Sequence, residues 1–135
     1  MAGYSGTPLA KKLGFKEGFR AGFVNPPKGF RKDLGNLPAN VEICGEPLRK
    51  PLDLIVLFAD SQQVLKREFP SLAKKLAGNG MLWISWPKKS SGVITDLSDN
   101  SVREIGLAAG LVDVKVCAVN DIWSGLKFVY RLKDR

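Results

Sequence analysis

Two stretches of almost uninterrupted apolar residues, 53–59 and 81–86, stand out in the hydropathy pattern of the chain. Such runs lack the alternation of a half-exposed strand and are typical of strands covered on both faces in a parallel sheet. Pro87 ends the second run, because proline cannot donate to a strand ladder. Trp83 and Trp86 are an odd number of positions apart, so the pattern predicts that they point to opposite faces of the sheet.

Between and after these strands, apolar residues recur at the spacing of an amphipathic helix. The first helical face carries Val64, Leu65, Phe69, Leu72, Ala73 and Leu76. Pro70 interrupts this pattern, either as a kink or in the first turn of a second helix. The glycines of 78–80 are expected to close the segment as a helix end. Another helix is predicted over 99–109, with Ser98 and Ser101 as candidate caps.

Shorter patterns complete the order of elements. A strand is predicted over 19–24, a helical turn over 30–34 and a short strand over 41–44. Residues 113–119 and 126–132 predict two antiparallel strands joined by a six-residue loop. The fold class that follows is α/β: a three-layer, Rossmann-like arrangement with a mainly parallel sheet and a C-terminal antiparallel hairpin. We expect one domain over residues 1–135.

Composition changes this picture mainly through what is missing. The chain of 135 residues has no histidine, and its 21 Lys and Arg against 13 Asp and Glu give a formal net charge of +8. A Ser-His-Asp triad, a Cys-His pair and every zinc site that contains histidine are therefore excluded. Cys44 and Cys117 form no C-x-x-C motif, so we expect two reduced thiols, no metal and no cofactor.

The positive charge bears on partners and location. The excess lies in residues 1–90, whereas opposite charges balance over 91–135. Such an excess attracts phosphates, of a small anionic ligand or of a nucleic acid, and the alternative is an ordinary solvated surface. With no hydrophobic signal region and no apolar run near the ~20 residues of a bilayer span, we expect a cytoplasmic protein without a membrane partner. The sequence leaves the oligomeric state open.

Candidate site residues follow from the expected sheet, because open parallel sheets bind ligands at the carboxyl ends of their strands. Lys88, Lys89 and Ser90 follow the strand 81–86 and could hold a phosphate or a carboxylate. Arg103 could clamp the same anion, or could pair with Asp96 or Asp99 on the surface. Trp123, in the expected hairpin loop, could stack on a ligand or fold back over the sheet edge.

No nucleophile stands at an informative spacing from a base, so no catalytic residue is assigned. We therefore expect a non-enzymatic binding or regulatory domain that recognises an anionic ligand or partner at this rim of the sheet. Two alternatives stay open, a divergent methyltransferase-like enzyme and a weak nucleic-acid binder.

The first alternative comes from a resemblance over the second half of the chain. The pieces that carry it are Asp53 at a strand start, Leu76-Ala-Gly-Asn-Gly80, Trp83-Ile-Ser and Ala109-Gly-Leu111. In this order they resemble the C-terminal half of Rossmann-like methyltransferases, which implies their scaffold. The first half departs from that pattern. Where those enzymes hold S-adenosylmethionine with a Gly-rich loop, this chain has Asn25-Pro-Pro-Lys-Gly29, with a single glycine.

Longer strings carry a second resemblance over nearly the whole chain. They are Gly3-Tyr-Ser-Gly-Thr-Pro-Leu9, Trp86-Pro-Lys-Lys-Ser90, Thr95-Asp-Leu97, the stretch 102–113, Lys115-Val-Cys117 and Trp123-Ser-Gly-Leu126. These strings resemble a family of small bacterial proteins, a domain of unknown function. The resemblance implies the same α/β fold and a bacterial origin, and it implies no activity.

Overall fold

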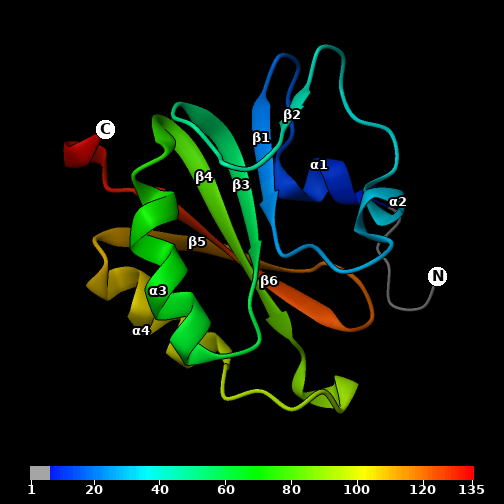
Figure 1. Cartoon of the computed structure of the whole chain (residues 1–135), viewed down its shortest axis with the longest axis vertical. Coiled ribbons are helices and arrows are strands. Elements are labelled where there is room, and N and C mark those ends of the chain that lie inside the picture. The colour runs from blue at the N-terminus through cyan, green and yellow to red at the C-terminus, as the bar shows by residue number, and fades with distance from the viewer. Residues whose placement is uncertain (1–6) are drawn as a thin grey trace.

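The computed structural model describes residues 7–135, which form one six-stranded sheet with helices on both faces (Figure 1). The strands are β1 (Arg20–Val24), β2 (Glu42–Cys44), β3 (Leu52–Phe58), β4 (Leu76–Pro87), β5 (Leu111–Ala118) and β6 (Trp123–Tyr130). The α-helices are α1 (Leu9–Leu13), α2 (Phe30–Leu34), α3 (Gln62–Ala73) and α4 (Asp99–Ala108), and the 3-10 helices are η1 (Lys89–Ser91) and η2 (Leu132–Asp134).

The strands lie in the order β2-β1-β3-β4-β6-β5. The first four in this order are parallel to one another, and β6 runs antiparallel to both of its neighbours, β4 and β5. A mainly parallel α/β sheet with an antiparallel C-terminal pair is the fold class that the hydropathy pattern predicts, and this prediction is confirmed. The strings from residues 3–6 that resemble the bacterial family lie outside the described residues.

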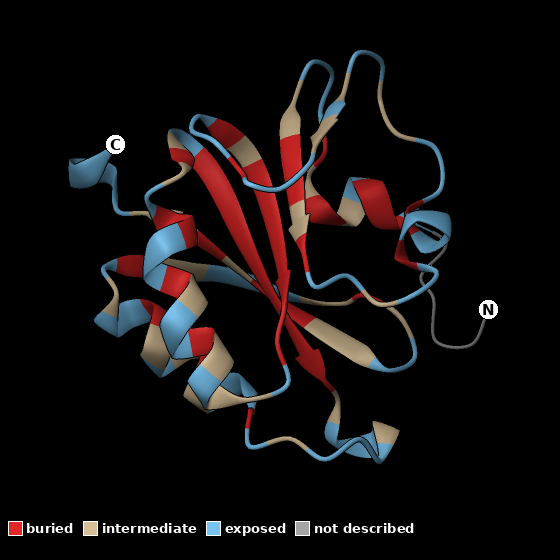
Figure 2. Ribbon diagram, in the orientation of Figure 1, coloured by how far each residue is buried: buried red, intermediate tan, exposed pale blue. Residues whose placement is uncertain are grey.

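The central strands form the core, and Figure 2 shows them buried while the outer faces of the helices are exposed. On one side α3 and α4 cover a cluster that includes Leu57 and Trp86. On the other side α1 and α2 cover a second cluster that includes Phe58 and Trp83. The two tryptophans of β4 therefore point to opposite faces, as predicted. The indole N–H of Trp83 donates to the carbonyl of Leu13 at 2.8 Å and fastens α1 to the sheet.

Side-chain caps fix where the two long helices begin. The Ser61 hydroxyl accepts a hydrogen bond from the Val64 N–H at 3.2 Å at the start of α3. At the start of α4, Ser98 and Ser101 form a reciprocal capping box, in which each side chain accepts from the other residue's N–H. Pro70 lies inside α3, so the segment is one helix and no second helix begins there.

The predicted helix end at 78–80 is wrong, because β4 already begins at Leu76. The register explains this difference. Leu76 pairs with Leu52 and Met81 pairs with Leu54, so the residues between them bulge out of the ladder. A Cβ at Gly80 would lie 2.8 Å from the Leu52 carbonyl oxygen, so a close backbone approach requires this glycine. Glycines that indicate a helix end serve a β-bulge instead.

The predicted six-residue hairpin loop is also too long, because β5 ends at Ala118 and β6 begins at Trp123. The Asn120 side-chain oxygen accepts from the N–H groups of Ile122 and Trp123, at 2.8 and 2.9 Å. This Asx-type turn tightens the connection and places Trp123 on the strand.

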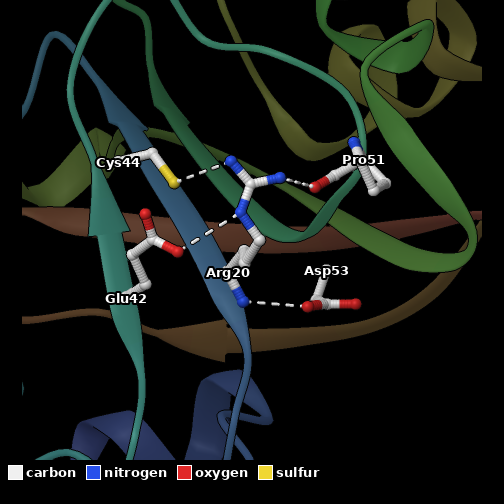
Figure 3. Close-up of polar contacts among 5 residues, drawn as sticks. All are labelled: Arg20, Glu42, Cys44, Pro51 and Asp53. Atoms are coloured by element: carbon white, nitrogen blue, oxygen red, sulfur yellow. Dashed lines mark hydrogen bonds and ion pairs between the residues drawn. The ribbon is translucent and has the colours of Figure 1, made fainter.

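The connection from β2 to β3 crosses β1 without a helix, through residues 45–51. Arg20, the first residue of β1, holds both ends of this crossover (Figure 3). Its guanidinium donates to the Pro51 carbonyl at 2.6 Å and to the Cys44 sulfur at 3.5 Å, and its Nε lies 3.4 Å from a Glu42 carboxylate oxygen. Its backbone N–H donates to Asp53 at 2.8 Å. Leu48, buried in the middle of the crossover, covers the side of β1 that a helix would otherwise cover.

Candidate functional site

Among the four parallel strands, the strand order reverses between β1 and β3. From β1 the chain moves outward to β2, and it then returns across β1 to place β3 on the opposite side. The connections that leave the carboxyl ends of β1 and β3 therefore run in opposite directions along the sheet. Such a topological switch point is where open α/β sheets form their ligand crevice. The structure thus places the candidate site where Val24 and Phe58 end their strands.

Two polar residues follow these strand ends. Asn25 adopts a left-handed backbone conformation with a φ of 56°, which is uncommon for a residue other than glycine. Its exposed side-chain amide donates to the Phe58 carbonyl at 3.5 Å, a long hydrogen bond that spans the two strands. Asp60 is exposed, and its carboxylate forms no hydrogen bond to another residue of 7–135. A carboxylate and an amide are thus available at the switch.

Residues 88–92, which we call the lysine loop, follow β4 at the same rim. The Lys88 N–H donates to the Ile122 carbonyl at 2.7 Å, which joins the loop to the turn before β6. The Ser91 hydroxyl donates to the Lys88 carbonyl at 2.6 Å and closes a turn. Lys89 and Ser90 are exposed, and the side chains of Lys88, Lys89 and Ser90 make no hydrogen bond or ion pair within residues 7–135. Their ligand-binding role stays a prediction.

The segment that leads from the lysine loop to α4 is fastened to the start of α3. Thr95 donates its hydroxyl hydrogen to the Asp60 carbonyl at 2.6 Å. The Asp96 carboxylate accepts from the Gln62 N–H at 2.8 Å. Between these anchors and the lysine loop, the Ile94 side chain is 95% exposed. Asp96 is thus engaged with α3 and does not pair with Arg103.

The side-chain hydrogen bonds and the ion pair of Arg103 are not with residues of the lysine loop. Its Nε is 3.0 Å from an Asp113 carboxylate oxygen near the start of β5, and its Nη1 donates to Asn100 at 3.3 Å. The predicted partners of a surface pair, Asp96 and Asp99, are not the ones it has. β5 runs toward the rim, and Asp113 lies in its first half. This ion pair therefore fastens α4 to the half of β5 that is farther from the rim.

Trp123 is half-buried and packs its ring against the sheet. Its ring centroid lies 5.2 Å from that of Phe58, in an edge-to-face contact at 85°. Phe58 contacts Phe30, and Phe30 contacts Phe23, so a row of aromatic rings runs from β1 to β6. The ring therefore folds back over the sheet, which is the second of the two placements considered from the sequence. In the strand register, Trp123 pairs with Pro87, the residue before the lysine loop.

One contact at the rim has no signal in the sequence. The Asn120 side-chain amide donates to the Asp33 carboxylate at 3.1 Å, which joins the β5–β6 turn to α2 across 87 positions of sequence. Asn120 lies in a turn and Asp33 lies in a helix, so no local sequence pattern indicates that they are partners. Asp33 is thus added to the polar groups at the rim.

Other kinds of site find no support in the part of the chain that is described. No group of three or more metal-ligating side chains occurs within residues 7–135. Cys44 and Cys117 are free. None of the helices in this range has the length and apolar character that a membrane span requires.

Comparison with solved structures finds a similar fold in several methyltransferases. The chain is similar to precorrin-6Y C5,15-methyltransferase from Geobacter metallireducens, with a TM-score of 0.62 at 10% identity over 91% of this chain and 86% of that one. A SAM-dependent methyltransferase from Aquifex aeolicus gives a TM-score of 0.58 at 17% identity, over 89% and 86%. Magnesium protoporphyrin IX methyltransferase from Synechocystis, solved with bound SAH, gives 0.57 at 11%, over 91% and 78%.

These identities are low, so the likeness establishes the fold and nothing finer. No family model and no curated protein sequence matches the chain. The described residues thus have a Rossmann-like methyltransferase fold.

Proposed function

We propose that the chain is a divergent methyltransferase-type enzyme whose ligands bind at the switch between β1 and β3 and at the adjoining lysine loop. One observation carries the proposal. The parallel strands of this methyltransferase-like fold reverse their order between β1 and β3. At that position stand the exposed Asn25 amide and the Asp60 carboxylate, which makes no hydrogen bond within residues 7–135. Carboxyl strand ends at a switch point are the general ligand position of such sheets.

The donor set at the switch bears on the cofactor that this fold class implies, S-adenosylmethionine. The Asp60 carboxylate suits an ammonium group or ribose hydroxyls, and the Asn25 amide suits a carboxylate. The loop 25–29 adds only three backbone N–H groups, since Pro26 and Pro27 have none. The residues present thus fit the polar groups of this cofactor, with fewer backbone donors than a Gly-rich loop offers. When bound, the cofactor would supply an electrophilic methyl group.

The lysine loop supports an anionic substrate for this enzyme. Lys88, Lys89 and Ser90 present two ammonium groups and a hydroxyl that no residue of 7–135 engages. Trp123 lies beside them, because its neighbour Ile122 accepts the Lys88 N–H. A phosphate or carboxylate would be held there by charge-assisted hydrogen bonds. Arg103 is not proposed to bind this anion, because its side chain fastens α4 to β5.

Calorimetric titration with S-adenosylmethionine and with S-adenosylhomocysteine tests the cofactor part. We expect the wild type to bind both, and Asp60→Asn to weaken binding because it removes the free carboxylate at the switch. The matched control is Asp121→Asn, which removes an exposed carboxylate beyond β5. No heat and no thermal shift at millimolar cofactor would overturn the proposal of methyl transfer.

The substrate part has its own test. A panel of nucleotides and sugar phosphates is titrated into the wild type, into Lys88→Ala/Lys89→Ala and into Lys66→Ala/Lys74→Ala. The last variant removes the same charge from exposed positions of α3 and its C-cap. We expect a loss of anion binding in the lysine-loop variant alone. Anion binding without any cofactor binding would instead favour a non-enzymatic binding domain.

A further inference from the structure

A second basic surface lies away from the rim, on the side of the sheet that carries α1. Lys115 on β5 and Lys127 on β6 stand directly opposite each other in the antiparallel register. Lys127 is in turn opposite Trp83 on β4, whose ring belongs to the cluster under α1. The register therefore brings both ammonium groups to this side of the sheet, and Lys16, which follows α1, lies near enough to Lys127 to interact with it electrostatically.

The positive charges of Lys16, Lys115 and Lys127 repel one another. Like charges directly opposite across two strands destabilise a sheet. The pKa of Lys127 is lowered, first by burial and then by the positive charges of Lys115 and Lys16. Within residues 7–135 the ion pairs are Arg20 with Glu42, Arg67 with Glu68 and Arg103 with Asp113, and none of them involves the three lysines. Within residues 7–135, no carboxylate thus forms an ion pair with these lysines.

We propose that this surface, formed by Lys16, Lys115 and Lys127, binds the phosphate backbone of a nucleic acid. Phosphates spaced along a chain suit separate ammonium groups at a protein surface, and the contacts release counterions. This assignment is independent of the lysine loop and of the proposed enzyme activity. It also differs from a general attraction by the basic residues 1–90, because Lys115 and Lys127 lie outside that range.

The chemistry of the surface favours this occupant over two others. A second copy of the chain carries the same net charge of +8 and would present the same positive surface. A lipid surface binds through apolar side chains together with basic ones. Val116, which is 54% exposed on β5, alternates with Lys115 and pairs with Leu126 of the opposite core cluster, so it points to the other side.

The test measures binding of short labelled RNA and DNA, single-stranded and duplex, as a function of salt concentration. We expect the wild type to bind at low salt, with an affinity that falls steeply as salt rises. Lys115→Ala/Lys127→Ala should reduce the slope of log affinity against log salt by about 1.4 for a single strand, which is two phosphate contacts. Lys66→Ala/Lys74→Ala removes the same charge from the opposite side and should bind as the wild type does.

Two further measurements keep the outcome decisive. Lys115→Glu places opposite charges on β5 and β6, so the fold should be retained while binding falls at least as far as in the double alanine variant. Lys88→Ala/Lys89→Ala should leave nucleic-acid binding unchanged, which separates this surface from the lysine loop. Absence of binding at low salt, an equal loss in the α3 control, a loss carried by the lysine loop, or binding only to anionic vesicles would each overturn the proposal.

Discussion

The two outer strand pairs of the sheet are built in opposite ways. On one edge, β1 and β2 pair over three residues, and a helix-free crossover covers them on one side. Their facing charges, Arg20 and Glu42, are opposite in sign and in register. On the other edge, β6 and β5 pair over seven positions under α4, and their facing charges, Lys115 and Lys127, are alike. A short edge is thus secured by charge, whereas a long edge under a helix tolerates repulsion.

The comparison predicts where the same small substitution does the most harm. A Cβ at Gly106 of α4 would collide with the ring of Phe128, which is fully buried on β6. A Cβ at Gly22 of β1 would lie 2.6 Å from a methyl group of Leu48, the tip of a flexible side chain in the crossover. The first neighbour is fixed by the core, and the second can move with its loop.

We therefore expect Gly106→Ala to reduce the free energy of unfolding by about 2–3 kcal/mol and Gly22→Ala by about 1 kcal/mol or less, as measured by urea unfolding. The sign alone is informative, because Gly→Ala inside a helix ordinarily stabilises by about 1 kcal/mol. A Gly106→Ala variant as stable as the wild type would mean that α4 does not press on β6 as described.

The second prediction concerns the contacts of Arg20 that secure the short edge formed by β1 and β2. Arg20→Ala removes the side-chain hydrogen bonds to Pro51 and Cys44 and the ion pair with Glu42. We expect a loss of about 1–2 kcal/mol in the free energy of unfolding, since these are a few net hydrogen bonds at a partly exposed site. Amide hydrogen exchange over the crossover should accelerate more than exchange over β3.

Arg49→Ala serves as the control for this prediction. Arg49 lies in the same crossover and is exposed, so its removal takes away the same charge without the anchoring contacts. Its exchange pattern and stability should match the wild type. If both variants behave alike, Arg20 does not secure the edge, and the covering by Leu48 alone holds it.

The same contrast explains what could be predicted from the sequence. Strands β3 and β4 and the C-terminal pair were predictable because each is a long apolar or alternating run. The crossover over 45–51 has neither period, and its anchor depends on Arg20, which lies 24 positions before Cys44. The glycines of 78–80 indicate a helix end and a β-bulge equally well, and only the register with Leu52 decides between them.

The candidate site divides in a similar way. The rim and the exposure of the lysine loop follow from the parallel strands, because carboxyl ends of such strands share one edge. The partner of Arg103 does not follow, since Asp113 lies ten positions away on another element, and Asp96 and Asp99 are nearer in sequence. Local proximity in sequence predicted the wrong carboxylate because the turn between α4 and β5 folds the chain back on itself.

The third prediction, with the smallest effect, concerns the repulsion on the long edge. Lys127 has a lowered pKa, so over the alkaline range between that value and its ordinary one the unfolded chain binds more protons than the folded protein. Stability from this group therefore rises with pH in that range, and the protonated form costs stability below it. Lys127→Met should accordingly be slightly more stable than the wild type at neutral pH, by less than about 0.5 kcal/mol.

The difference between Lys127→Met and the wild type should shrink as the pH rises through the lowered pKa. Comparing the two proteins is necessary, because Cys117 and Tyr130 also titrate in the alkaline range with raised pKa values, mainly through burial, and their contribution falls with rising pH. Both residues are present in the two proteins, so their effect cancels in the difference. A variant less stable than the wild type at neutral pH would mean that the stem of Lys127, packed over the sheet beside Trp83, contributes more than its charge costs. In that case the long edge, like the short one, is held by its facing side chains.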